Sequence, residues 1–423
     1  MVTRLASPLR AALSATLALA ALAGVAHGER RAARTSGGSA PAAPPAAALE
    51  IPCLATAADG ACTRWALDGF YQSLTATEDG RASHPARISF VGDSITASDH
   101  IPGRLREVFG ARFGDGGPGF IHISPPRDFC AHHQVRRASG GWTVHSVANQ
   151  MAADRLLGFG GGTAETTGGG RIRLTPVGAA VARAQVFYLA QPGGGAFDVR
   201  VDGAAAATVQ TGGAGKLGAV VDVPITGTLR SFDLRARGRV RLFGIVLETA
   251  RGVVVDNLGV VNASTKTWSR IEPGHWRAQI EQRAPDLMVV MIGANEAIWI
   301  GGKKLAAYEG TVRNLLAPIR AAHPDGACLV ISPLAMVDYT RKGLPLRPAI
   351  PAMVAAQRAA ARASGCAFWD IAAWMGNAAG TAAWRKAGLM TNDYAHPTIA
   401  GDRRIADALS SALLDGYRTY RRP

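Results

Sequence analysis

Short apolar runs that alternate with helical patterns occupy the parts of the chain before residue 142 and after residue 250. Residues 88–91 have a buried-strand pattern, and helical spacing follows over residues 101–109. After residue 250 we expect strands at 253–258, 287–292, 328–332 and 367–370, and helices at 275–282, 305–323, 350–364 and from 399. Continuous apolar strands suit a sheet that is covered on both faces. The pattern therefore predicts an α/β domain with a doubly wound parallel sheet.

A different pattern lies between residues 142 and 250. Charged helical repeats disappear, and short alternating segments are separated by glycine clusters. Strands are expected at residues 170–174, 184–189, 197–201, 220–223 and 231–234. Regularly spaced short strands with turn signals are typical of a β-sandwich. We therefore expect an inserted all-β sandwich at 142–250, which divides the α/β domain into residues 51–141 and 251–423.

The N-terminal region has the pattern of an export signal. A positively charged start precedes an apolar stretch at residues 11–25, which is too short to span a bilayer comfortably and ends in small residues. We interpret residues 1–28 as a cleaved signal peptide, with an uncleaved anchor as the alternative. Residues 29–50, rich in Ala and Pro, then form a flexible linker, and helical spacing at 63–73 predicts a helix. This predicts a secreted or periplasmic protein without stable membrane insertion after cleavage.

Length and charge narrow the choice of partners. The 423 residues exceed the usual size of a single core, and 48% of them are hydrophobic, which suits two packed domains. The net charge of +15 comes from Arg scattered among Ala and Gly, without a basic helix, zinc-finger spacing or aromatic RNA-binding motif. We therefore expect an anionic cell envelope, and no nucleic acid, as the partner of a monomer.

The five cysteines bear on disulfide formation and on metals. Cys53 and Cys62 are close enough to close a small loop in an oxidising compartment. Cys328 and Cys366 each precede an expected strand, so a disulfide between adjacent strands and two buried thiols both remain open; Cys130 is left over. The spacing of Cys and His matches no metal-binding motif, so we expect neither a metal nor a cofactor.

Polar motifs follow the expected strands, where an open parallel sheet places its functional groups. Ser94, in a Gly-Asp-Ser tripeptide, follows the first strand; Asn295 follows the strand at 287–292; Asp393 and His396 precede the last helix. A serine hydrolase needs a nucleophile, a base, a carboxylate that orients the base, and oxyanion donors. Each motif alone is explained equally well by a turn or a helix cap, but together they supply all four groups.

The order and spacing of these motifs resemble the GDSL/SGNH hydrolase superfamily. Its blocks Gly-Asp-Ser, Gly-x-Asn-Asp and Asp-x-x-His correspond to residues 92–94, 293–296 and 393–396, with Glu296 in place of Asp. The segment Arg-Phe-Gly-Asp-Gly-Gly-Pro-Gly-Phe at 112–120 and the sandwich after the first block are similar to the peptidoglycan O-acetylesterase branch, whose inserted domain resembles a carbohydrate-binding module. The resemblance covers about residues 60–415 and implies a flavodoxin-like SGNH domain.

The resemblance implies a carboxylic ester hydrolase that transfers an acyl group to water. Ser94 would attack an acetyl ester on an acetylated envelope polysaccharide, peptidoglycan in particular. His396 would act as base and then acid, while Asp393 orients its imidazole. The Ser94 amide, the Asn295 side chain and one N–H of the second block would form the oxyanion hole.

The second block departs from the pattern of the family. Relatives often read Gly-x-Asn-Gly-Ala there, whereas residues 258–264 read Leu-Gly-Val-Val-Asn-Ala-Ser. Gly259 is the nearest glycine and is the candidate donor. Asn262 and Ala263 remain open alternatives, because a backbone donor does not require glycine.

Three other functions fit the same motifs. A lipase or lysophospholipase of the superfamily would use the same residues, and an acetyltransferase would pass the acyl group to a sugar. The altered second block also fits a catalytically weakened glycan-binding protein.

Overall fold

A five-stranded parallel sheet lies at the centre of the α/β domain in this computed structural model, which describes residues 48–125, 130–178 and 180–422. Its strand order is β15-β3-β16-β17-β18, with β3 at Ala86–Gly92, β15 at Val253–Gly259, β16 at Leu287–Met291, β17 at Ala327–Ile331 and β18 at Ala367–Trp369. All neighbouring strands run parallel, and every residue in them is buried. The predicted doubly wound parallel sheet is confirmed.

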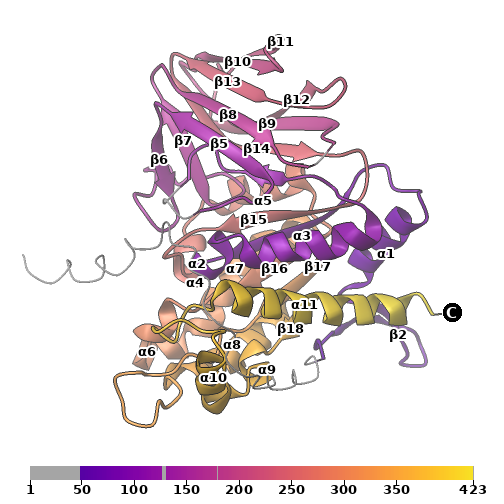
Figure 1. The fold of residues 1–423 in the computed structure, drawn as a ribbon, viewed down its shortest axis with the longest axis vertical. Coiled ribbons are helices and arrows are strands. Elements are labelled where there is room, and N and C mark those ends of the chain that lie inside the picture. The colour runs from indigo at the N-terminus through magenta and orange to yellow at the C-terminus, as the bar shows by residue number, and fades with distance from the viewer. Residues whose placement is uncertain (1–47, 126–129, 179, 423) are drawn as a thin grey trace, which may run out of the picture. The chain divides into compact units, whose positions relative to one another are not determined.

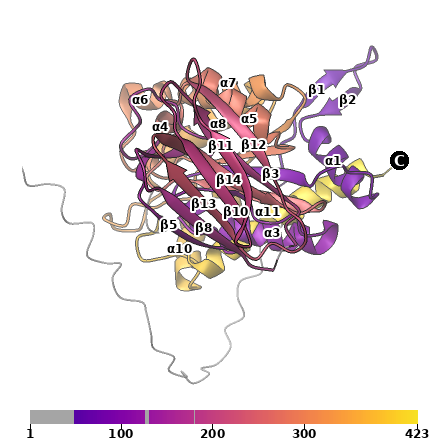
Figure 2. The ribbon, with the colours of Figure 1, turned by 90° about the horizontal axis from the view of Figure 1, so that it is seen from above.

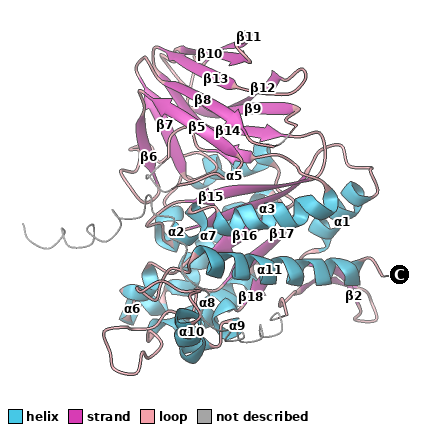
Figure 3. Ribbon diagram, in the orientation of Figure 1, coloured by secondary structure: helices cyan, strands magenta, loops and turns pink. Residues whose placement is uncertain are grey.

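Helices cover both faces of this sheet (Figures 1 and 3). One group packs together on one face: α1 (Asp68–Glu78), α3 (His100–Phe113) and α11 (Ile399–Tyr420). The second group is α5 (Pro273–Arg283), α7 (Tyr308–Ala322) and α8 (Ala349–Ala363). Short helices complete the domain: α2 (Ser94–Ala97), α4 (Thr265–Trp268), the 3-10 helix η1 (Glu296–Ile298), α6 (Gly302–Ala306), α9 (Ile371–Trp374) and α10 (Asn377–Lys386).

Two antiparallel sheets form the inserted sandwich, which Figure 2 shows from above. The five-stranded sheet has the order β11-β10-β13-β8-β5, with β5 at Val135–Gly140, β8 at Arg171–Pro176, β10 at Ala196–Val201, β11 at Ala204–Gln210 and β13 at Phe232–Arg237. The six-stranded sheet contains β4 (Gly119–Ile121), β6 (Thr143–Ser146), β7 (Gly162–Thr166), β9 (Arg183–Ala190), β12 (Leu217–Pro224) and β14 (Val240–Glu248). Both β4 and β5 precede the expected boundary at residue 142.

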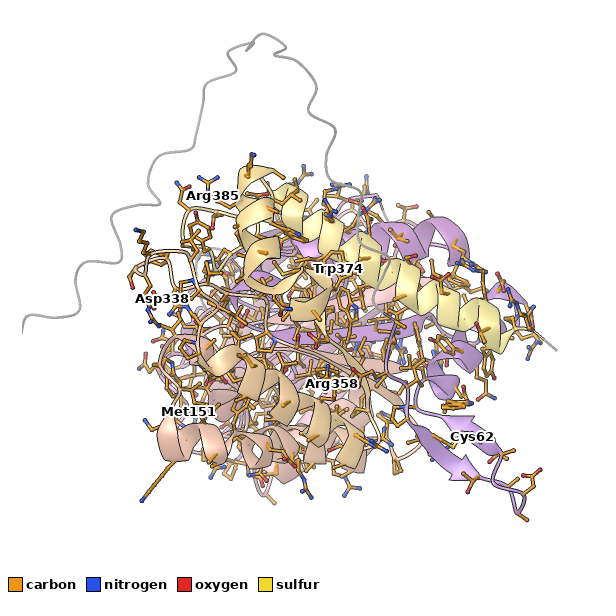
Figure 4. The ribbon with its side chains drawn as sticks, turned by 90° about the horizontal axis from the view of Figure 1, so that it is seen from below. Cys62, Met151, Asp338, Arg358, Trp374 and Arg385 are labelled. Atoms are coloured by element: carbon orange, nitrogen blue, oxygen red, sulfur yellow. A yellow bond between two sulfur atoms is a disulfide. The ribbon has the colours of Figure 1, made fainter. Side chains whose placement is uncertain are left out.

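The helix expected at residues 63–73 begins later, because a hairpin takes its first residues. Strands β1 (Cys53–Thr56) and β2 (Cys62–Trp65) pair in antiparallel, and the disulfide Cys53–Cys62 joins them. Figure 4 shows Cys62 on this hairpin. The carboxylate of Asp68 accepts the backbone N–H of Trp65 at 2.7 Å, and α1 starts at that aspartate.

The second disulfide joins two neighbouring strands of the sheet. Cys328 lies in β17, and Cys366 directly precedes β18, which pairs with it. The structure therefore selects the disulfide from the two arrangements left open by the sequence. Both bonds agree with folding in an oxidising compartment. The expected signal peptide and nearly all of the linker lie outside the described residues. Among the described helices, none is both long and apolar enough to cross a bilayer.

A buried ionic network joins the sandwich to the α/β domain. The guanidinium of Arg283, on α5, donates two hydrogen bonds of 2.8 Å to Asp256 on β15 and a third of 2.5 Å to Glu248 at the end of β14. Arg87, on β3, donates to the same Glu248 carboxylate at 2.8 and 3.0 Å. The side chains of Arg283, Glu248 and Asp256 are fully buried. Elements of both domains are thus held by one set of charge-assisted hydrogen bonds.

Candidate active site

Ser94 lies at the sharp turn between β3 and α2. The strand ends at Gly92, where an added Cβ would lie 2.0 Å from Thr96 Oγ1, so only glycine allows the helix to start this close. Asp93 caps α2 by accepting the N–H of Ile95 at 3.1 Å. Ser94 is the first residue of the helix, so its own N–H has no acceptor within the helix and faces outward from its N-terminus.

The loop before α11 brings a histidine and an aspartate to Ser94. His396 Nε2 lies 2.9 Å from Ser94 Oγ, and His396 Nδ1 lies 2.7 Å from Asp393 Oδ2. The other carboxylate oxygen of Asp393 accepts the N–H groups of Ala395 and His396, at 2.9 and 3.0 Å, and the hydroxyl of Thr391 at 2.5 Å. These bonds fix the carboxylate, which in turn fixes the imidazole. About half of the His396 and Asp393 side-chain surface remains accessible.

Nearby carboxyl groups set the pKa of the imidazole. The hydrogen bond to Asp393 raises the pKa of His396 above 6.5 against the effect of burial, and the charges of Asp393, Asp93 and Asp402 raise it further. The pKa of Asp393 lies well below its usual value, because its hydrogen bonds and the histidine outweigh its burial. Burial raises the pKa of Asp93 to about 7 and that of Asp402 to about 8. The carboxylates around His396 therefore favour the protonated imidazole more than water does.

Asn295 and Glu296 hold the second block in place. Asn295 Nδ2 donates to the carbonyl of Ala263 at 2.8 Å, and Glu296 Oε1 accepts the N–H of Thr265 at 2.5 Å. An amide nitrogen carries two hydrogens, so the second hydrogen on Asn295 Nδ2 remains available for a ligand. Glu296, which stands where the family has Asp, thus caps α4 and positions the loop rather than donating to substrate.

Gly259 does not fit the role of oxyanion donor predicted for it. Its N–H donates to Asn257 Oδ1 at 2.9 Å, and it is the last residue of the buried strand β15. A Cβ at this position would lie 2.2 Å from the backbone nitrogen of Ala97. Glycine is therefore required here for close packing of β15 against α2, which explains its presence without a catalytic role. Ala263 is also unsuitable, because its N–H donates to the carbonyl of Val260 at 3.0 Å.

Asn262 remains as the second-block candidate. It is exposed, and within the described residues its backbone N–H donates no hydrogen bond. Its φ of 62° lies in the left-handed region, which glycine adopts freely and asparagine adopts more readily than most other residues. Asn262 can therefore take the backbone conformation that the missing second glycine would have adopted.

Two further features near the site were absent from the sequence prediction. Thr391, which orients Asp393, stands two residues before it, and its hydroxyl donates to that carboxylate. Tyr394, inside the Asp-x-x-His motif, has a φ of 55° and stacks on the exposed Tyr339 with ring centroids 6.5 Å apart. Trp299, just after the third block, is 54% exposed, whereas Trp268 and Trp276 are core residues.

These groups can together perform nucleophilic acyl transfer. A hydroxyl within hydrogen-bond distance of an oriented imidazole can be deprotonated as it attacks a carbonyl carbon. The free amide N–H groups of Ser94 and Asn262 and the amide side chain of Asn295 are available to the oxyanion that forms. Within the described residues, no group of His, Cys, Asp and Glu is arranged to hold a metal ion.

Comparison with known proteins agrees with this chemistry. Residues 227–404 match the GDSL-like lipase/acylhydrolase family, a span that contains Asn262, Asn295, Asp393 and His396 but begins after Ser94. A solved structure described as a peptidoglycan O-acetylesterase in action shares 24% identity and a TM-score of 0.72, covering 83% of this chain and 96% of the other.

More distant structures share less of the fold. A lipase/acylhydrolase from Enterococcus faecalis has 15% identity and a TM-score of 0.30, covering 39% of this chain and 77% of the other. A family two carbohydrate esterase from Clostridium thermocellum has 12% identity and a TM-score of 0.29, covering 66% of this chain and the whole of the other. The search of curated proteins found no match. Residues 227–404 are thus similar to GDSL-like lipases and acylhydrolases, which agrees with the ester-hydrolase chemistry that the site supports.

Proposed function

We propose that this protein is a secreted serine esterase that removes O-acetyl groups from a cell-envelope polysaccharide, peptidoglycan in particular. One observation carries the catalytic part: Ser94 Oγ, the His396 imidazole and the Asp393 carboxylate form a continuous chain of contacts of 2.9 and 2.7 Å. Two others support the substrate and the location. The fold, including the inserted sandwich, is similar to a peptidoglycan O-acetylesterase over 83% of the chain, and two disulfides suit an exported protein.

The reaction would proceed through an acyl-enzyme. Ser94 Oγ attacks the acetyl carbonyl while His396 Nε2 takes the hydroxyl proton, and Asp393 stabilises the imidazolium. The tetrahedral oxyanion accepts hydrogen bonds from the amides of Ser94 and Asn262 and from the Asn295 side chain. His396 then returns the proton to the sugar oxygen, which leaves as an alcohol. Water attacks the acetyl-serine by the same route in reverse and releases acetate.

Acetate release tests the proposal. The full chain should release acetate from purified O-acetylated peptidoglycan faster than from acetylated xylan, and not from peptidoglycan whose acetyl groups have been removed by base. A series of aryl esters should show rates that fall as the acyl chain lengthens. Rates that rise with chain length would support a lipase instead. No acetate from any of these substrates would refute the esterase, and acetate transferred to an added sugar would identify an acetyltransferase.

The pH profile of kcat/KM should have an acid limb centred above pH 6.5. The base must be unprotonated, and Asp393 raises the pKa of His396, so activity is lost as the pH falls through that raised value. Asp393→Asn removes the negative charge, which should move the midpoint to lower pH as well as slow the reaction. A midpoint that does not move would contradict the assignment of His396 as base.

A second acidic residue serves as the matched control for this pH experiment. Asp402 also faces His396, but it acts on the imidazole only through its charge, and burial raises its own pKa to about 8. Asp402→Asn should therefore move the midpoint less than Asp393→Asn does. An equal shift of the midpoint for both variants would mean that Asp393 affects the pKa of His396 no more than Asp402 does.

Substitutions at Asn262 should separate backbone from side-chain effects. Because a backbone N–H is the proposed donor, Asn262→Gly should keep kcat within about threefold of the wild type. Asn262→Val should lower kcat by about 10- to 100-fold, since a β-branched residue is strained at positive φ and the peptide would rotate away from the oxyanion. Thermal unfolding of both variants would show whether the fold is intact. A large loss in Asn262→Gly would instead assign the role to the side chain.

A further inference from the structure

An open groove crosses the outer face of the five-stranded sheet of the sandwich. Its volume is about 1200 Å³, and its walls come from all five strands, β5, β8, β13, β10 and β11. Figure 2 looks down on these strands from the side away from the α/β domain. The groove therefore belongs to the inserted domain and is separate from the Ser94 site.

The strand register concentrates arginine on this face. Side chains alternate between the two faces of a strand, so the outward positions of β8 include Arg171 and Arg173, and those of β13 include Asp233 and Arg235. Arg171 lies directly opposite Arg235 in the β8–β13 pairing. Like charges at opposite positions of an antiparallel pair destabilise it. The Arg171–Arg235 pair therefore does not stabilise the β8–β13 pairing, although Arg235 also lies opposite Asp198 on β10.

The carboxylates in the groove make their ion pairs with other arginines. Arg173 donates to Asp233 at 2.6 Å, and Arg237 donates to Asp198 at 2.8 Å. The groove lining contains four arginines against two aspartates. Among the described residues, no carboxylate pairs with Arg171 or Arg235, and both are exposed. Two adjacent guanidinium groups are thus presented to a ligand from neighbouring strands, which lie about 4.8 Å apart.

The rest of the lining indicates what kind of ligand would fit. Small residues leave the surface open, namely Ala138, Gly203 and Ala205 to Ala207, while Thr208, opposite Asp198, supplies a hydroxyl. The lining contains no aromatic side chain, so stacking on a sugar ring or a base has no platform here. Recognition must therefore rest on charge and hydrogen bonds.

We infer that this groove binds a carboxylate-bearing polysaccharide, and that Arg171 and Arg235 both donate hydrogen bonds to one of its carboxylates. Arginine matches the two oxygens of a carboxylate in a bidentate geometry. Asp198 and Asp233 accept hydrogen bonds from sugar hydroxyls, and the Thr208 hydroxyl lies on the same face. The two carboxylates also disfavour polyphosphate, which has no hydroxyl groups to donate to them, whereas a uronic-acid glycan carries both carboxylates and hydroxyls.

Binding of an unacetylated probe tests this inference separately from esterase activity. The full-length protein should bind a purified oligogalacturonate, measured by calorimetry at physiological salt, and should bind a neutral cello-oligosaccharide of equal length much more weakly. Arg171→Gln/Arg235→Gln should raise the Kd for oligogalacturonate at least about tenfold. It should not lower the unfolding temperature, because the substitutions relieve a like-charge pair.

A matched charge control completes the design. Arg230 and Arg239 lie on the sandwich outside the groove and are exposed, so Arg230→Gln/Arg239→Gln changes the net charge equally. This variant should keep the Kd within about twofold. Equal weakening of binding in both double variants would mean that general electrostatic attraction explains the binding, and would overturn the proposed site. Absence of binding by the wild type, or tighter binding of inorganic polyphosphate than of oligogalacturonate, would also overturn it.

Discussion

Ser94→Ala is expected to reduce kcat/KM for acetyl esters by about 10⁴-fold or more, the loss seen when a nucleophile is removed from such a triad. The physical reason is that Ser94 Oγ forms the bond to the acyl carbon, and the imidazole 2.9 Å away has no other group to activate for that attack. The substitution removes a half-buried hydroxyl at the surface end of the sheet, so the unfolding temperature should stay near that of the wild type. The measurement is acetate release together with an aryl acetate assay.

A double variant distinguishes a catalytic unit from separate contributions. When two residues act as one catalytic unit, the losses in kcat/KM that their single substitutions cause do not multiply. Ser94→Ala/His396→Ala should therefore be no slower than the slower of the two single variants. Ser98→Ala is the matched control, because Ser98 lies four residues further on and its hydroxyl makes only local backbone bonds: it donates to the carbonyl of Ile95 and accepts the N–H of His100. It should stay within a few-fold of the wild type. Retention of a tenth of the activity by Ser94→Ala, or multiplicative losses in the double variant, would refute the triad.

The hydrophobic pattern predicted most of the α/β domain because its strands are buried on both faces. The five sheet strands lie within two residues of the expected positions, as at Leu287–Met291. Amphipathic strands of the sandwich were partly found, but β14 was missed although all nine of its residues are buried. The helix start near residue 63 was wrong, because a disulfide hairpin and the hydrogen bond from the Trp65 N–H to Asp68 override a local periodicity that a helix would also satisfy.

The spacing of the motifs indicated which residues meet, but could not assign backbone donors. Ser94 and Asn295 follow strand ends, which parallel strands place at one edge of the sheet, whereas Asp393 and His396 were identified by their spacing before the last helix. Gly259 was chosen because it is a glycine, whereas its N–H is occupied by Asn257 and its missing side chain serves packing. Asn262 has a positive φ, and Asn295 and Glu296 make hydrogen bonds to Ala263 and Thr265, which follow it. A sequence pattern does not contain such contacts.

The network at Arg283 should make the largest single contribution to stability. Arg283→Met would leave the Glu248 and Asp256 carboxylates buried without their main cation, and the pKa of Glu248, held at about 2 by the arginines, shows that it is charged. Breaking a buried ion pair by removing one partner costs about 3–5 kcal/mol. We therefore expect a fall of this size in the free energy of unfolding, measured by denaturant titration with probes in both domains.

An exposed arginine on the same helix provides the comparison. Arg277 pairs with Glu281 at 2.7 Å on the solvent side of α5, and half of its side chain is accessible. Arg277→Met should cost no more than about 0.5 kcal/mol, because solvent screens this pair and hydrates the carboxylate that remains. The contrast isolates burial as the cause, since both variants replace the same residue type in one helix. A cost below about 1 kcal/mol for Arg283→Met would mean that water reaches Glu248 and Asp256, and that apolar packing alone holds the sandwich to the sheet.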